Sequence, residues 1–138
     1  MSVRNIDEVV ARLSDVPEAM PDLELLVVFG STAKGRARAA SDVDLAVRCT
    51  GSADLEALHR VLAPRLGSDR LDLVDLRRAG PVLAFEVARS GRLIYESRGG
   101  RFREFQSLAS RRYCDTAKLR RAQRRAIEVF LERDELPT

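Results

Sequence analysis

Two short segments, Gly30–Gly35 (GSTAKG) and Ser41–Leu45 (SDVDL), decide how this chain is interpreted. The first is a glycine-serine turn directly after an apolar run, and the second opens another apolar run with aspartates at alternate positions. Because residues two apart in a strand point to the same face, Asp42 and Asp44 are expected to project together. Facing carboxylates repel each other unless a cation lies between them. Since Mg²⁺ prefers oxygen ligands and bridges carboxylates to phosphates, the pair predicts a magnesium site.

The glycine-serine turn suits a phosphate group. Glycine has no Cβ to block the approach, so backbone N–H groups of the turn can reach phosphate oxygens. Ser31 can add its hydroxyl, although the same side chain also suits the N-cap of a short helix, and Lys34 supplies positive charge. A phosphate-binding turn beside metal-binding carboxylates predicts phosphoryl or nucleotidyl transfer.

Length and composition fit one globular domain. The chain has 138 residues, of which 45% are hydrophobic and 33% are charged. No apolar run approaches the roughly 20 residues that span a bilayer, and the first fifteen residues contain no apolar segment typical of a signal peptide. Cys49 and Cys114 lack metal-ligand spacing. We therefore expect a cytoplasmic protein that does not bind membranes.

The hydrophobic pattern predicts alternating helices and strands followed by a helical tail. Pro17 and Pro21 are expected to end the first helix, and Ser52 is expected to cap another. The expected elements are a helix over 5–13, strands over 23–29, 42–49, 70–76 and 92–96, helices over 32–38, 52–66 and 81–91, and one or two long helices after Gly99-Gly100. This order predicts an α/β (α+β) fold in which a small mixed sheet is flanked by helices. We expect a core at residues 1–98 and a helical extension at 99–138 packed on the same domain.

The tail combines an apolar stripe with a basic surface. Phe102, Phe105, Ala109 and Leu119 have the spacing of a buried seam. Ten arginine and lysine side chains between residues 98 and 125 are opposed by only two acidic ones. Such a stretch suits nucleic acid, an acidic protein surface or a substrate polyphosphate, or it is simply a solvated helix face.

Gly30-Ser31, ten intervening residues and Asp42-Val43-Asp44 resemble the signature of the DNA polymerase β nucleotidyltransferase superfamily. The compact turn, with Ser41 before the first aspartate, is similar to that of the minimal nucleotidyltransferases, the MNT family. The later segments LDLVDL, AFEV and GRLIYE and the aromatic tail with Tyr113 also resemble that family. Lys34 stands where related turns often carry arginine, so the charge is kept without bidentate reach to phosphate.

The resemblance implies a third metal carboxylate from a neighbouring strand, and two positions fit. Asp72 and Asp75 differ by three, so on a regular strand they face opposite sides. Asp72 is expected mid-strand, where a carboxylate without a purpose is costly. Asp75 is expected near the strand end, where a solvated or capping role costs little. These arguments favour Asp72.

The resemblance also implies an activity and a partner. MNT proteins occur as antitoxins beside HEPN-domain ribonuclease toxins, and some are thought to transfer AMP from ATP to a tyrosine of the toxin. In this chain the implied ligands of two Mg²⁺ ions are Asp42, Asp44 and Asp72, and the implied nucleotide-binding residues are Gly30, Ser31, Lys34, Gly35 and Ser41. A binding-only antitoxin and a small-molecule nucleotidyltransferase are the alternatives, and we expect nucleic-acid binding to be weak.

Overall fold

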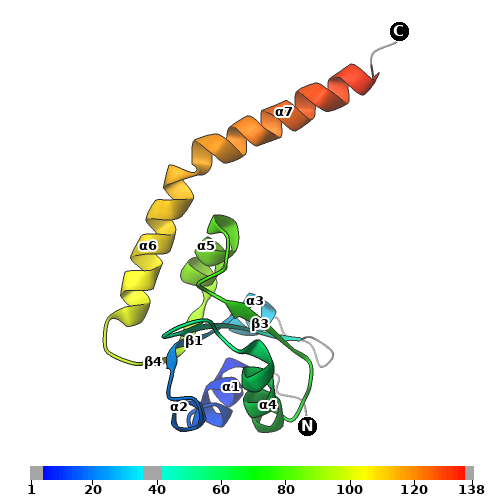
Figure 1. Ribbon diagram of the computed structural model, residues 1–138. Helices are drawn as coiled ribbons and strands as arrows, with labels where there is room; N and C mark the ends of the chain where they lie inside the picture. The colour runs from blue at the N-terminus through cyan, green and yellow to red at the C-terminus, as the bar shows by residue number, and fades with distance from the viewer. Residues whose placement is uncertain (1–4, 36–41, 136–138) are drawn as a thin grey trace.

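A four-stranded mixed sheet forms the centre of the protein, in the strand order β3-β2-β1-β4 (Figure 1). The computed structural model describes residues 5–35 and 42–135. β1 pairs antiparallel with β2 and with β4, whereas β2 and β3 are parallel. The elements are α1 (Ile6–Arg12), α2 (Val16–Ala19), β1 (Leu23–Phe29), α3 (Gly30–Ala33), β2 (Val43–Cys49), α4 (Leu55–Leu66), β3 (Leu71–Asp75), α5 (Pro81–Ser90), β4 (Arg92–Glu96), α6 (Arg101–Asp115) and α7 (Ala117–Glu135). The expected α/β fold is confirmed.

The sheet has a hydrophobic core on each face. Alternate residues of β1 and β2, such as Leu26 and Leu45, pack with α1, α2 and α4. The intervening residues, such as Val27 and Ala46, pack with α5 and α6. Because the strands contribute apolar side chains to both faces, they are nearly continuous hydrophobic runs in the sequence. Figure 1 shows the two helical layers on either side of the sheet.

Three helix boundaries differ from the sequence prediction. Pro17 does not end a helix but lies in the first turn of α2, where its fixed φ and missing N–H are tolerated. The N-cap of α4 is Asp54, not Ser52, and its carboxylate accepts a hydrogen bond from the N–H of Ala57 at 3.1 Å. α3 ends at Ala33, and the predicted continuation over 36–38 lies outside the described residues.

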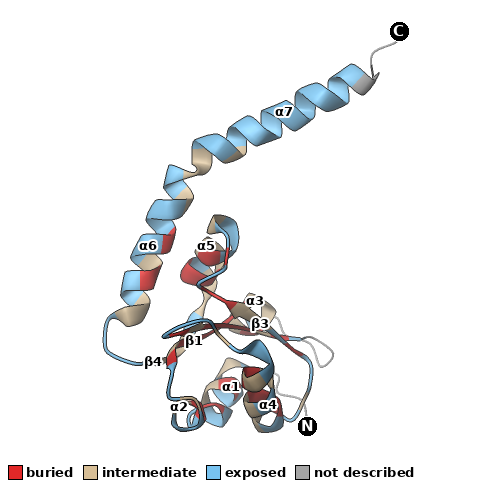
Figure 2. Cartoon of the chain, viewed as in Figure 1, coloured by how far each residue is buried: buried red, intermediate tan, exposed pale blue. Residues whose placement is uncertain are grey.

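The C-terminal extension consists of two helices with different surroundings. α6 packs on α5, and its Phe105 and Ala109 are buried in the core. α7 leaves the body of the protein, and Leu119, Ile127 and Phe130 are 59%, 60% and 63% exposed (Figures 1 and 2). The predicted buried seam is therefore correct for α6 and wrong for Leu119, because the chain turns between the two helices.

An aromatic stack fixes the direction in which α7 begins. The rings of Phe85 in α5 and Tyr113 in α6 are stacked, with centroids 4.0 Å apart. The guanidinium of Arg120 lies 3.8 Å from the centroid of the Tyr113 ring and donates to the Tyr113 carbonyl at 2.8 Å. This arrangement joins the first turn of α7 to α6 through a cation–π contact. Among the described helices, none is both long and apolar enough to cross a bilayer.

Candidate active site

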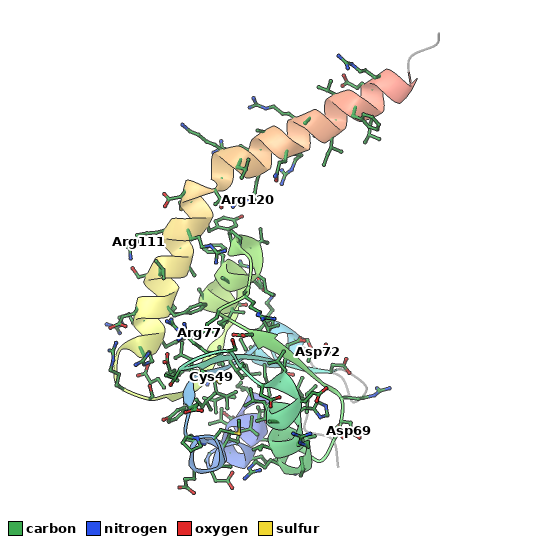
Figure 3. All side chains as sticks on the ribbon, viewed as in Figure 1. Cys49, Asp69, Asp72, Arg77, Arg111 and Arg120 are labelled. Atoms are coloured by element: carbon green, nitrogen blue, oxygen red, sulfur yellow. The ribbon has the colours of Figure 1, made fainter. Side chains whose placement is uncertain are left out.

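Three neighbouring strands, β1, β2 and β3, bring the glycine-serine turn and two of the aspartates together at one end of the sheet. Phe29, the last residue of β1, is paired with Asp44, so Gly30 follows directly beside that residue. On the other side of β2, Asp44 is paired with Asp72 of the parallel strand β3. Paired residues of adjacent strands share a face, so both carboxylates project on the side of the sheet that carries α5. Figure 3 labels Asp72 at this end of the sheet.

Gly30 allows the turn to approach the carboxylate of Asp44. Its φ of +71° is in the left-handed region that favours glycine. A Cβ at this position would lie 2.2 Å from Oδ2 of Asp44, far closer than van der Waals contact. The glycine is therefore required both by its backbone conformation and by the carboxylate beside it.

The three predicted metal carboxylates interact electrostatically. Partial burial raises the pKa of Asp44 above its ordinary value, and the negative charges of Asp72 and Asp42 raise this pKa further. Asp42 is exposed immediately before β2, and Asp72 is exposed on β3. A cation bound among these oxygens would relieve the repulsion. The donor set thus has the chemistry that a hard divalent ion requires.

The described side chains are not gathered into a complete metal site. Within residues 5–35 and 42–135, no group of three or more His, Cys, Asp or Glu side chains is close enough to hold a metal ion. Asp44 and Asp72, paired across β2 and β3, offer two adjacent ligands. Ser41, the remaining predicted residue of this segment, lies outside the described residues.

Asp75 lies on the opposite face of the sheet from Asp72. It is paired with Val47, whose side chain belongs to the core formed with α1, α2 and α4. Its carboxylate accepts the N–H of Arg77 at 3.0 Å and so stabilises the turn after β3. The sequence predicts that Asp72 is the more costly carboxylate to bury and that Asp75 is solvated. The structure shows the reverse, with Asp75 only 8% exposed and Asp72 exposed. The geometry nevertheless favours Asp72, because Asp72 is paired with Asp44 and Asp75 is not.

Lys34, at the C-cap of α3, forms an ion pair that the sequence did not predict. Its Nζ lies 3.0 Å from Oε1 of Glu86 in α5. Hydrogen bonds from Arg89, Lys34 and Ser90 lower the pKa of Glu86 to about 2. Glu86 thus remains ionised at neutral pH and ties the end of the turn to α5. Periodicity alone could not reveal this contact, because the partners are 52 residues apart.

The other turn residues are open to approach. Ser31 is half-buried in α3, and Gly35 is exposed with a φ of +70° and nothing within 4 Å of where a Cβ would be. Close to the Lys34–Glu86 pair lies a depression of about 660 Å³. Its lining residues are Val82, Leu83, Phe85, Glu86, Arg89 and Tyr113. A substrate that contacts the turn can therefore extend over α5.

A family model described as polymerase β nucleotidyltransferase matches residues 12–99. The chain is 32% identical over 126 residues to the protein adenylyltransferase MntA of Aphanizomenon flos-aquae, which covers 83% of this chain and 84% of that protein.

Two solved complexes contain similar chains. One is a toxin–antitoxin with AMP-PNP, at 29% identity and a TM-score of 0.65, covering 91% of this chain and 97% of that chain. The other is a tri-AMPylated HEPN toxin of Shewanella oneidensis with its MNT antitoxin, at 26% identity and a TM-score of 0.61, covering 91% and 96%.

The matched range includes the glycine-serine turn as well as Asp42 and Asp44. The similarity to MntA extends beyond this region over most of both chains. On these grounds the chain belongs to the polymerase β nucleotidyltransferase family, among the protein adenylyltransferases related to MntA.

Proposed function

We propose that this protein transfers AMP from ATP to a hydroxyl, in our view a tyrosine hydroxyl, of a HEPN-domain toxin and thereby acts as its antitoxin. The observation that carries the proposal is the pairing of Asp44 with Asp72 beside the Gly30 turn. This arrangement combines clustered carboxylates with a turn open to phosphate. The named relatives and the two complexes supply the class of acceptor.

In the proposed reaction the acceptor oxygen attacks the α-phosphorus of ATP. A new oxygen–phosphorus bond forms, the bond to the bridging oxygen of the β-phosphate breaks, pyrophosphate leaves, and the hydroxyl proton passes to solvent. The backbone of Gly30–Gly35 and the Ser31 hydroxyl would hold the triphosphate. Lys34 would exchange its bond to Glu86 for a phosphate oxygen. Catalysis is then mainly positioning and electrostatic stabilisation.

Asp42, Asp44 and Asp72 would hold Mg²⁺, with two ions expected from the resemblance. When bound, such ions stabilise the charge that develops on the attacking and leaving oxygens. The raised pKa of Asp44 supports this assignment, since a bound cation would offset the repulsion from Asp72 and Asp42 that contributes to it. Asp44 is the second residue of β2, and Asp42 directly precedes the strand, so both oxygen donors come from one short segment.

The exposed apolar face of α7 supports a protein acceptor. Leu119, Ile127, Phe130 and Leu131 lie at helical spacing and are more than half exposed. A helix with an uncovered apolar stripe fits a helical partner that covers it. We therefore expect Phe130→Glu to weaken the complex with the toxin without lowering the melting temperature. Glu128→Ala, on a different face of α7, serves as the matched control.

The arginine-rich stretch supports only weak nucleic-acid binding. Several of its members are occupied within the chain: Arg98 by Glu104, Arg101 by Glu24, and Arg120 by Tyr113. Lys118, Arg121 and Arg125 form a smaller basic surface on α7. RNA affinity should therefore fall steeply with salt and stay well below the affinity for the protein partner.

The decisive experiment follows the phosphorus atom. The purified chain is mixed with a HEPN-domain toxin, Mg²⁺ and ATP labelled at either the α- or the γ-phosphate. The proposal requires label from the α-position on the toxin, release of pyrophosphate, and an AMP adduct on tyrosine by mass spectrometry. Label from the γ-position would contradict it.

The Asp42→Asn/Asp44→Asn double variant separates the alternatives. If the wild-type chain and the double variant both bind the toxin and block its ribonuclease activity equally, and neither leaves an AMP adduct, the protein is a binding-only antitoxin. If AMP is transferred to a small hydroxyl compound but not to the toxin, the acceptor assignment is wrong while nucleotidyl transfer stands.

A further inference from the structure

A second cavity lies at the other end of β2, away from the aspartates. It has a volume of about 240 Å³, is open to solvent on one side, and is lined by residues of β2, α5 and α6 and of the turn after β3. Its lining residues are Arg48, Leu76, Arg77, Ala84, Phe105, Leu108, Ala109 and Arg112. Arg48 follows Asp44 by four residues, which is ~13 Å along a strand. The cavity is thus separate from the nucleotide site.

The lining arginines exceed the acidic groups that face them. Glu24 is the carboxylate that meets them, with Oε2 at 3.4 Å from Nε of Arg48 and Oε1 at 3.7 Å from Arg77. The same carboxylate also binds Arg101 at 2.7 Å. Arg112 forms no ion pair with a described residue and donates only to the carbonyl of Ala79, at 3.0 Å. The cavity therefore carries an excess of positive charge.

These guanidinium groups are held in place, and the one carboxylate of Glu24 neutralises them only in part. Arg77 donates to the carbonyls of Cys49 and Thr50 at 2.7 and 3.1 Å. Nε of Arg48 is buried and makes no hydrogen bond within the described residues, and Glu24 faces it only as an ion-pair partner at 3.4 Å. An anion in the cavity would provide acceptors for groups that are already oriented, and guanidinium binds phosphate and carboxylate in the same forked geometry.

The remaining wall is apolar. Leu76 and Phe105 are buried side chains of the core on this face, and Leu108 is 57% exposed at the cavity. We propose that this cavity binds a small organic anion, a phosphate or carboxylate carried on a short apolar group. The arginines take the anionic group, and Phe105 and Leu108 contact the apolar part. The volume limits the ligand to fragment size.

Phenyl phosphate, benzoate and inorganic phosphate serve as probes of the full-length chain, with binding followed by amide NMR titration. We expect saturable binding of phenyl phosphate or benzoate with shifts in α6 and at the end of β2. Whichever of the two binds more tightly identifies the anionic group, and inorganic phosphate alone should bind more weakly because it lacks the apolar contact.

Matched variants locate the binding. Arg112→Gln and Leu108→Glu should each weaken binding at least tenfold. Leu108 is exposed, so its variant should fold even if Arg112→Gln does not. Arg111→Gln and Ser107→Glu, at exposed neighbouring positions of α6 that do not line the cavity, should leave affinity unchanged. Figure 3 shows Arg111 pointing away from α5.

Three results would overturn the proposal. The first is the absence of saturable binding by either organic probe. The second is an equal loss of affinity in the variants and their matched controls. The third is a loss of affinity in Lys34→Gln but not in Leu108→Glu, which would place the probes in the nucleotide turn instead.

Discussion

The two ends of β2 carry charged clusters of opposite character. At its start, Asp44 lies beside Asp72 with like charge, and its pKa is raised. At its end, Arg48 lies beside Glu24, and a register shift in β1 between Leu23 and Leu25 brings that carboxylate to the arginines. In the first cluster the carboxylates repel one another, and a bound cation can relieve that repulsion. In the second cluster the carboxylate of Glu24 attracts arginines of β2 and α6 and so links these elements to β1. The repulsion in the first cluster therefore indicates a bound cation, whereas Glu24 in the second stabilises the fold and leaves its arginines with an excess of positive charge.

Removing the repelling aspartates should have the largest effect on activity and a small effect on stability. Metal-bound carboxylates support several kcal/mol of transition-state stabilisation, and about 1.4 kcal/mol corresponds to a tenfold change in rate. We therefore expect Asp42→Asn/Asp44→Asn to reduce AMP transfer roughly a thousandfold. The melting temperature without Mg²⁺ should stay the same or rise. Transfer at the wild-type rate would show that the site is elsewhere.

Alanine substitutions at Asp72 and Asp75 should have different effects, the first on AMP transfer and the second on stability. Asp72→Ala removes an exposed carboxylate beside Asp44, so transfer should fall by roughly a hundredfold or more, on the same free-energy scale, while the fold is kept. Asp75→Ala removes a buried acceptor of the Arg77 N–H, so we expect a loss of ~1–3 kcal/mol in the free energy of unfolding. Full activity in Asp72→Ala together with inactive but stable Asp75→Ala would reverse the assignment.

Removing Glu24 tests the attractive end of β2. The Glu24 side chain is 12% exposed and meets three arginines, so Glu24→Gln leaves their charges without an anionic partner. We expect a loss near the lower end of the ~3–5 kcal/mol that follows the breaking of a buried ion pair. Glu104→Gln is the matched control, since Glu104 binds Arg98 on the surface with 62% exposure. Its effect on stability should be much smaller than that of Glu24→Gln, because solvent screens a surface ion pair.

Denaturant unfolding monitored by circular dichroism measures both variants. Equal losses in Glu24→Gln and Glu104→Gln would contradict the distinction between the buried cluster and a surface pair. Transfer activity of the folded fraction should be retained in both, because neither residue lies at the nucleotide turn.

Local patterns predicted the elements because each pattern depends on neighbours in sequence. β1 (Leu23–Phe29) and β4 (Arg92–Glu96) agree with the sequence prediction at both boundaries, and α5 begins at the predicted Pro81. The N-cap of α4 was misplaced because Ser52 and Asp54 are both suitable caps, and only the backbone conformation decides between them.

Contacts between residues far apart in the chain could not be predicted from the sequence patterns. Lys34 looked free to bind phosphate, yet its partner Glu86 is brought to it by the packing of α5. Glu24 offered a signal, since it is the one carboxylate in the apolar run of β1, but its arginine partners come from three other parts of the chain. Leu119 was wrongly predicted to be buried, because a sequence pattern shows that a helix stripe is apolar but not whether another element packs on it.

The pH dependence of stability should show the repulsion at Asp44 directly, as the smallest of these effects. Its pKa in the folded protein is raised above the ordinary value of 3.8. The ionised carboxylate therefore destabilises the fold once the pH has risen through the folded pKa, and this penalty disappears as the pH falls below 3.8. Asp44→Asn lacks the penalty. In EDTA its melting temperature should exceed that of the wild type at neutral pH, and the difference should close towards about pH 4.

Asp15 provides a control of opposite sign for this measurement. The hydrogen bonds that Asp15 accepts from Arg65 lower the pKa of Asp15 below its ordinary value of 3.8. The ionised carboxylate therefore stabilises the fold at pH values above 3.8, and this contribution is lost as the pH falls through the lowered pKa of the folded protein. Asp15→Asn should thus melt below the wild type at neutral pH, with a gap that also closes in acid. Adding Mg²⁺ should raise the melting temperature of the wild type and of Asp15→Asn, but not of Asp44→Asn. A lower melting temperature for Asp44→Asn at neutral pH would mean that attraction, not repulsion, dominates at the start of β2.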